Sequence, residues 1–172
     1  MIKVPRYMFF TKGVGVHKYK LGSFELALRN AGIGRFNIVN VSSIFPPNCS
    51  VISRKRGLSM LKTGQIIYCV MARIETNEPN RLISAAIGLA IPTEGDGYGY
   101  ISEYHAYGVN RERAKKYAED LAVTMLATTL GIESDTEKAR DERIKTMHIC
   151  QSARGNKDGL WTTCIAAAIF VE

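Results

Sequence analysis

Strand-like segments separated by turns, with only one long helical segment, constrain the fold of this chain most strongly. The long helix is predicted over Arg111–Leu130, because Asn110 is a good cap, apolar residues recur at helical spacing, and a glycine follows. A shorter helix is predicted over Phe24–Ala31, with Ser23 as its cap and Gly32 as its stop. We therefore expect a single α+β domain with sheets stacked between two helices. Strands are predicted at Tyr7–Phe10, Phe36–Val41, Gln65–Ile74, Leu82–Ile91, Tyr100–Tyr107, Ile144–Ser152 and Leu160–Val171.

Three segments interrupt this pattern. Gly13 and Gly15 are expected to break the first strand. The basic run Arg54-Lys55-Arg56 has no aromatic residues between its charges, so we interpret it as a solvated loop rather than a nucleic-acid platform. Residues 132–145 are rich in charged side chains. We interpret them as a solvated insertion, although they could also cover the edge of an assembly or bind a partner.

Composition argues against several classes of protein. The 172 residues suit one domain with a sizeable core, and no apolar run reaches the roughly 18–20 residues that span a membrane. The N-terminus lacks the layout of a signal peptide, and the four cysteines show no CxxC spacing. We therefore expect a cytoplasmic protein with structural thiols. The three histidines are scattered, which gives a metal site no support. The net charge of +7 is spread along the chain, so we expect no nucleic-acid partner.

The doublet Ser42-Ser43 lies where a predicted strand runs into a turn that two prolines make stiff. The hydroxyl of Ser43 could attack the carbonyl of Ser42 and convert the peptide bond into an ester through an oxyanion. Candidates to stabilise the oxyanion are Asn37 and the backbone amides around Gly32 and Gly34. Elimination from the ester would release the preceding chain and leave a pyruvoyl group at position 43. A serine pair alone carries little weight, because such pairs are common in loops.

The wider sequence resembles the pyruvoyl-dependent arginine decarboxylases over nearly the whole chain, with its elements in the family's order. The resemblance implies a four-layer αββα sandwich that cleaves itself into residues 1–42 (the beta chain) and 43–172 (the alpha chain). It also implies a homotrimer of cleaved protomers, possibly a dimer of trimers, with active sites at the subunit boundaries. The segments that carry it are Asn30-Ala-Gly-Ile-Gly34, Asn37, Val41-Ser-Ser-Ile-Phe-Pro-Pro47, Ile83-Ser-Ala-Ala-Ile-Gly-Leu-Ala-Ile-Pro92, Ser102-Glu-Tyr104 and Cys164-Ile-Ala-Ala-Ala168.

The resemblance assigns roles to single residues. L-Arginine would be converted to agmatine and CO₂ through a Schiff base on the self-generated pyruvoyl group, without a metal, on the route to polyamines or in acid resistance. Glu103 takes the place of the family's proton donor. Glu25 takes the place of an aspartate that binds the guanidinium of the substrate, and its longer side chain leaves the choice of substrate open. Leu28, Gly34 and Ile44 match other positions that line the substrate pocket.

Three other functions stay open from the sequence alone. A pyruvoyl decarboxylase of histidine, ornithine or lysine would keep the serine chemistry but place a different cation against Glu25. A non-catalytic basic trimer that binds nucleic acid would account for the net charge of +7, but not for the serine pair, Asn37 or Glu103. A homologue that no longer processes itself would serve a structural role, and the intact serine pair argues against it.

Overall fold

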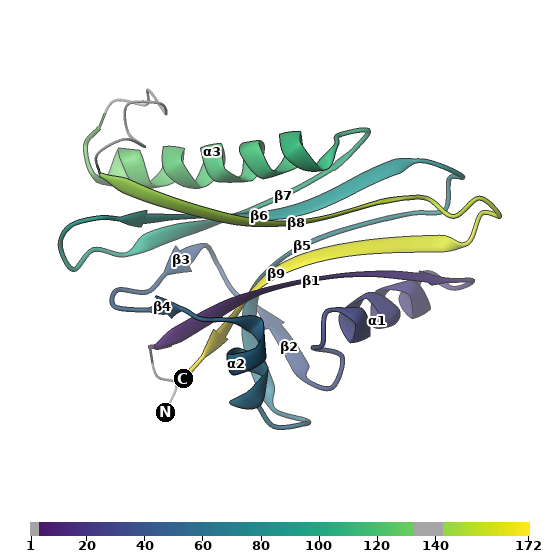
Figure 1. Cartoon of the computed structure of the whole chain (residues 1–172), viewed down its shortest axis with the longest axis horizontal. Coiled ribbons are helices and arrows are strands. Elements are labelled where there is room, and N and C mark those ends of the chain that lie inside the picture. Colours follow the sequence, from purple (N-terminus) through teal and green to yellow (C-terminus); the bar gives the residue numbers. More distant parts are fainter. Residues whose placement is uncertain (1–3, 133–142) are drawn as a thin grey trace.

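Two β-sheets face each other, and helices cover their outer faces (Figure 1). This computed structural model describes residues 4–132 and 143–172. Its helices are α1 (Lys20–Asn30), α2 (Arg54–Ser59) and α3 (Arg111–Thr129). Its strands are β1 (Tyr7–His17), β2 (Asn37–Asn40), β3 (Ile44–Phe45), β4 (Ser50–Val51), β5 (Ile66–Thr76), β6 (Leu82–Pro92), β7 (Gly99–Tyr107), β8 (Ile144–Arg154) and β9 (Trp161–Val171).

The strands form a five-stranded sheet in the order β2-β5-β9-β1-β4 and a four-stranded sheet in the order β3-β7-β6-β8. Helix α1 packs on β1 and β9 of the first sheet, and α3 packs on β6, β7 and β8 of the second. The predicted α+β sandwich, with helix layers outside two sheets, is therefore confirmed. The predicted strands are all present; β5 to β8 extend one or two residues further at an end than expected, and β1 extends seven residues further.

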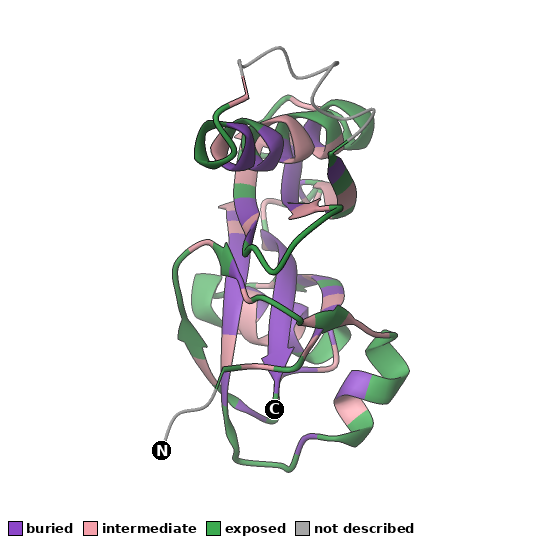
Figure 2. Ribbon diagram, turned by 90° about the vertical axis from the view of Figure 1, so that its left-hand side faces the viewer, coloured by how far each residue is buried: buried purple, intermediate pink, exposed green. Residues whose placement is uncertain are grey.

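The core between the sheets is built largely from small and branched side chains. Strand β6 is buried along most of its length, and β9 is buried from its second residue onward. Figure 2 shows the buried residues concentrated on these central strands. Small side chains let the two sheets approach closely, and branched and aromatic ones fill the remaining space. The cluster includes Phe45, Ala72, Ala85, Ile87, Leu89, Ile101, Ala166 and Ala168.

The expectation that two glycines break the first strand is wrong. Strand β1 continues to His17 and pairs with β9 along its whole length. A Cβ atom at Gly13 would lie 2.1 Å from the carbonyl oxygen of Ala27, and one at Gly15 would lie 2.2 Å from that of Ser23. The glycines are there because α1 lies almost directly on the strand, so no side chain fits between them.

Helix α1 begins earlier than predicted. It starts at Lys20, after Tyr19, and the expected cap Ser23 lies inside it. The hydroxyl of Ser23 is buried, donates to the carbonyl of Lys20 at 2.7 Å, and lies 2.6 Å from the hydroxyl of Thr163 on β9. Ser23 therefore ties the helix to the sheet instead of capping it. The predicted stop is confirmed, since Gly32 has a φ of 80°.

The basic run at Arg54 is not a loop, because it forms the short helix α2, which Ser53 caps by accepting from the N–H of Arg56. The guanidinium of Arg54 donates at 3.2 Å to the carbonyls of Ala31 and Asn30, at the end of α1. Part of the positive charge that could have indicated a nucleic-acid partner therefore binds the carbonyl groups left without helical partners at the end of α1.

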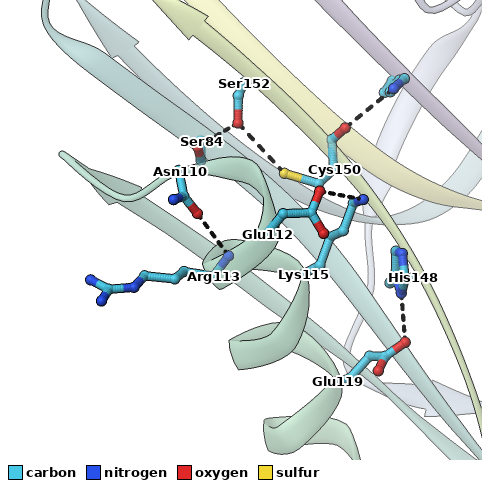
Figure 3. Close-up of polar contacts among 10 residues, drawn as sticks. Ser84, Asn110, Glu112, Arg113, Lys115, Glu119, His148, Cys150 and Ser152 are labelled. Atoms are coloured by element: carbon cyan, nitrogen blue, oxygen red, sulfur yellow. Dashed lines mark hydrogen bonds and ion pairs between the residues drawn. The ribbon is translucent and has the colours of Figure 1, made fainter.

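Helix α3 matches its prediction closely. Asn110 caps it by accepting from the N–H of Arg113 at 2.9 Å. Figure 3 shows Glu119 pointing from α3 toward His148 on β8, with Oε1 and Nδ1 2.6 Å apart. Within the described residues, no helix is long and apolar enough to cross a membrane. Most of the charged segment predicted as an insertion, residues 133–142, lies outside the described residues.

Candidate active site

The peptide bond between Ser42 and Ser43 lies where the chain crosses from one sheet to the other. Just after β2, the N–H of Val41 donates at 2.9 Å to the carbonyl of Cys69 in the five-stranded sheet. Just before β3, the carbonyl of Ser43 accepts at 2.7 Å from the N–H of Ile101 in the four-stranded sheet. Hydrogen bonds from two different sheets therefore hold the chain on either side of this bond, with Ser42 between them.

The chain after the serine pair is fixed by a buried side chain and a closed turn. Ser42 is exposed and Ser43 is half-buried. Phe45 is only 2% exposed and belongs to the core between the sheets. The turn at Pro46 is closed by a hydrogen bond of 3.2 Å from the N–H of Cys49 to the carbonyl of Pro46. The stiffness predicted from the prolines is thus reinforced by a buried aromatic ring.

A cavity of about 670 Å³ lies beside the serine pair. Its walls are mainly apolar and come from both sheets and from the segment that joins them. The volume suits a small molecule or the side chains of another chain. Residues that line it include Val41, Ser42, Ile44, Pro46, Tyr68 and Phe170.

Glu103 lies on the same strand as the anchor of Ser43. It follows Ile101 by two residues on β7, so the two side chains share a face about 7 Å apart. Glu103 is exposed, and β3, which pairs only with the first two residues of β7, ends before reaching it. Burial, and secondly the negative charge of Glu103, raise the pKa of the Cys69 thiol to about 12. Glu103 thus lies near both chain segments that anchor the serine pair.

Asn37 lies at the other end of β2 from the serines. Its side-chain amide donates at 2.9 Å to the carbonyl of Gly64, and four residues of strand, about 13 Å, separate it from Val41. The residue nearer to the serines is Asn40, whose Oδ1 accepts at 3.1 Å from the thiol of Cys69. The sequence analysis did not identify Asn40, Cys69 or Ile101. Their contacts with the crossover depend on which strands are neighbours, and no short sequence motif indicates that.

The backbone amide at Gly32 is already used. Its N–H donates to the carbonyl of Arg29 at 2.9 Å, in the turn that ends α1. This hydrogen bond removes one of the amides considered for stabilising an oxyanion.

Three of the four predicted substrate residues gather around α1. Glu25 lies on the helix and pairs with Arg29, while Leu28 is buried between the helix and the five-stranded sheet. Gly34 follows the helix and packs against Arg29. The fourth residue, Ile44, directly follows Ser43 and is 41% exposed. The predicted residues therefore form two groups, one around α1 and one with Ser43 and Glu103 at the crossover between the sheets.

The side chains of the described residues offer no group of three or more histidines, cysteines, aspartates or glutamates that could hold a metal ion. The four cysteines are free thiols. Burial is the main cause that raises their pKa, to about 11 for Cys49 and about 12 for Cys69 and Cys164, so these thiols stay protonated near neutral pH. A carbonyl group made from Ser43 fits this setting, since its position is half-buried, anchored and beside a cavity.

Comparison with known proteins agrees with this geometry. Residues 7–172 match the family model described as pyruvoyl-dependent arginine decarboxylase. The chain is 55% identical to the pyruvoyl-dependent arginine decarboxylase of Methanococcoides burtonii, across 98% of this chain and 99% of that protein. It is 56% identical to pyruvoyl-dependent arginine decarboxylase 2 of Methanosarcina acetivorans, across 98% and 97% of the two chains.

A relative from a third organism has a similar name and a similar level of identity. The chain is 55% identical to the probable pyruvoyl-dependent arginine decarboxylase of Chloroherpeton thalassium, across 99% of this chain and 100% of that protein. The match spans both sheets and the crossover that carries the serine pair. With a serine pair at a doubly anchored crossover and such similarity over nearly its whole length, this chain belongs to the pyruvoyl-dependent arginine decarboxylase family.

Proposed function

We propose that the protein cleaves itself between Ser42 and Ser43 and then decarboxylates L-arginine to agmatine and CO₂. The observation that carries the proposal is the position of this peptide bond between hydrogen bonds to two different sheets. A bond held on both sides can be kept in a strained geometry, which costs of the order of 1–3 kcal/mol and has to be maintained by the surrounding fold.

Self-cleavage requires only groups that the chain supplies, and one water molecule. Oγ of Ser43 attacks the carbonyl carbon of Ser42, the C–N bond breaks, the hydroxyl proton passes to the released nitrogen, and an ester joins the two residues. Loss of the α-proton of residue 43 then breaks the bond between Cβ and Oγ and leaves Ser42 as a free carboxylate. Residue 43 is then dehydroalanine, which becomes an imine. Water hydrolyses the imine to a ketone and ammonia leaves, which completes the pyruvoyl group.

The pyruvoyl group supplies a carbonyl that binds the substrate's α-amine and a conjugated amide that accepts electrons as CO₂ leaves. The N–H of Ile101 would hold that amide, since it already binds the carbonyl oxygen of Ser43 at 2.7 Å. Glu103, in its acid form, would return a proton to the substrate's α-carbon. Its support is its place two residues from Ile101, on the same face of β7.

The substrate's side chain is assigned to the group around α1. A carboxylate accepts two parallel N–H bonds from a guanidinium, so Glu25 is the residue of choice there. Leu28, Gly34 and Ile44 are assigned to the walls of the pocket. Asn37 keeps its proposed role in self-cleavage only if it reaches the serines of another copy, because its own serines lie beyond the far end of β2.

A trimer would bring the two groups together across a subunit boundary. Glu25 belongs to the helix layer outside the five-stranded sheet, whereas Glu103 belongs to the four-stranded sheet. The chain near the crossover also exposes apolar side chains, Val39 at 40%, Val41 at 39% and Ile44 at 41%, which a second copy would cover. We therefore propose a homotrimer of cleaved protomers, or a dimer of such trimers. The free thiols suit the proposed cytoplasmic location.

Intact mass of the purified, denatured protein tests the first step. Two species matching residues 1–42 and 43–172 are expected, with the larger one lighter by one ammonia than the unmodified fragment. The variant Ser43→Ala should remain a single uncut chain without activity. A single full-length mass for the unaltered protein, or activity in Ser43→Ala, would refute the mechanism. Turnover of L-arginine measured beside histidine, ornithine and lysine then identifies the substrate.

A further inference from the structure

The carboxylate assigned to the substrate's guanidinium already binds a guanidinium of the protein itself. Oε1 of Glu25 lies 2.9 Å from Nε of Arg29, one turn further along α1. The two side chains are 43% and 67% exposed. Ion pairs with this spacing are common on helix surfaces and are individually weak. This pair differs from an ordinary surface pair because one partner, Glu25, is the carboxylate assigned to the substrate.

Arg29 also packs against Gly34, a second residue assigned to the substrate pocket. A Cβ atom at position 34 would lie 2.9 Å from Cγ of Arg29 and 3.1 Å from its backbone nitrogen. The aliphatic part of Arg29 therefore takes the space that a side chain at 34 would need. Leu28 precedes Arg29 in the chain and packs into the core beneath α1. Arg29 thus contacts Glu25 and Gly34 and directly follows Leu28 in the chain, so it adjoins three of the four residues assigned to the substrate.

The guanidinium of Arg29 and that of free L-arginine are the same chemical group. Each is planar, permanently charged and able to bind a carboxylate through a fork of N–H donors. Two like charges at one carboxylate repel each other. A substrate guanidinium that approaches Glu25 must therefore displace Arg29 or share the carboxylate with it. The ammonium of lysine or ornithine is a single point charge without the fork, so it competes less well.

We propose that Arg29 is a specificity-determining residue that occupies Glu25 until a guanidinium ligand displaces it. The proposal rests on the assignment of Glu25 to the substrate's guanidinium. Arg29 acts through Glu25 and takes no part in bond breaking. Its presence raises the KM for every cationic substrate and penalises ammonium substrates more than L-arginine. The ligand class is thus a free guanidinium compound, of which L-arginine and agmatine are examples.

The test compares KM and kcat for L-arginine in the processed protein and four variants. Arg29→Gln, which keeps a polar side chain on an aliphatic stem but shortens it and removes the charge, should lower KM about two- to fivefold, as expected for loss of a weak exposed ion pair. Its kcat should change by less than about twofold, because decarboxylation occurs at the other end of the substrate. Arg29→Lys keeps a cation beside Glu25 and should stay close to the unaltered protein. The ratio of arginine to lysine turnover should fall in Arg29→Gln.

Two further variants separate this inference from the proposed function. Lys115→Gln removes a cation from another exposed helical ion pair, that of Glu112 on α3, and should leave KM unchanged. Glu25→Gln should raise KM at least about tenfold, because a charge-assisted hydrogen bond is lost. An unchanged or higher KM in Arg29→Gln, with the expected rise in Glu25→Gln, would overturn the role of Arg29 alone. An unchanged KM in Glu25→Gln would overturn both assignments.

Discussion

Phe45 is the anchor whose removal best tests whether the fold drives self-cleavage. Its side chain is 2% exposed in the core between the sheets, two residues after Ser43. A buried aromatic side chain hides about 150–250 Å², which at about 25 cal/mol per Å² corresponds to about 4–6 kcal/mol. Alanine retains part of this area, so Phe45→Ala should destabilise the protein by about 3–5 kcal/mol.

The same substitution should slow self-cleavage. If the fold holds about 1–3 kcal/mol of strain in the segment, full relaxation would lower the cleavage rate by about 5- to 150-fold. The rate is measured by following the fraction of uncut chain after refolding of the precursor, and stability is measured by urea unfolding of variants that also carry Ser43→Ala. Phe45→Leu, a smaller perturbation, covers the case in which the alanine variant fails to fold.

Phe9→Ala is the matched control. Phe9 is 0% exposed but lies in the other core, between the five-stranded sheet and the helices, where a Cβ at Gly57 would touch its ring. It should lose about as much stability as Phe45→Ala, about 3–5 kcal/mol, while cleaving at nearly the normal rate. Equal cleavage rates in the two variants would mean that the anchor does not hold strain at the serine pair, and the reasoning would fail.

Three further predictions concern catalysis, packing and the thiols. Glu103→Gln should still cut itself, but decarboxylation should fall by roughly 10²–10⁴-fold; full activity would exclude Glu103 as the proton donor. Gly15→Ala should destabilise the protein by more than about 1 kcal/mol in urea, because its Cβ would lie 2.2 Å from the carbonyl oxygen of Ser23; an unchanged midpoint would contradict the close packing of α1. Cys69 and Cys164, whose burial raises the pKa to about 12, should resist iodoacetamide at pH 8 until the protein is unfolded, as followed by mass; equal labelling of the folded and unfolded protein would contradict their burial.

Local signals in the sequence were sufficient for most regular elements. The cap at Asn110 and the apolar spacing after it identify α3, and the β-branched run at residues 65–74 identifies β5. Gly13 and Gly15 were misread because a glycine that admits a neighbouring helix looks the same in sequence as one that ends a strand. Strands β3 and β4 have two residues each, too few to show any periodicity.

The candidate site could be predicted in its residue types but not in its arrangement. The serine pair and Glu103 are recognisable from their sequence context, and the fold brings them together where the chain crosses between the two sheets. The separation of Glu25 from that crossover depends on which sheet each element joins, which is a long-range property. The pairing of Glu25 with Arg29 follows from their i,i+4 spacing and could have been predicted. The packing of Arg29 against Gly34, which links the pair to the proposed pocket, is visible only in the structure.

The pairing of β1 has a consequence for the lifetime of the mature protein. If the chain is cut after Ser42, the released fragment still contributes β1, which lies between β9 and β4 inside the five-stranded sheet, along with α1 and β2. The precursor folds in one molecule, but the cut protein would have to reassemble from two, so its apparent stability would depend on concentration. Cleavage would therefore change refolding from a reaction of one molecule into an association of two: once diluted and unfolded, the two pieces would find each other far more slowly than the intact chain folds.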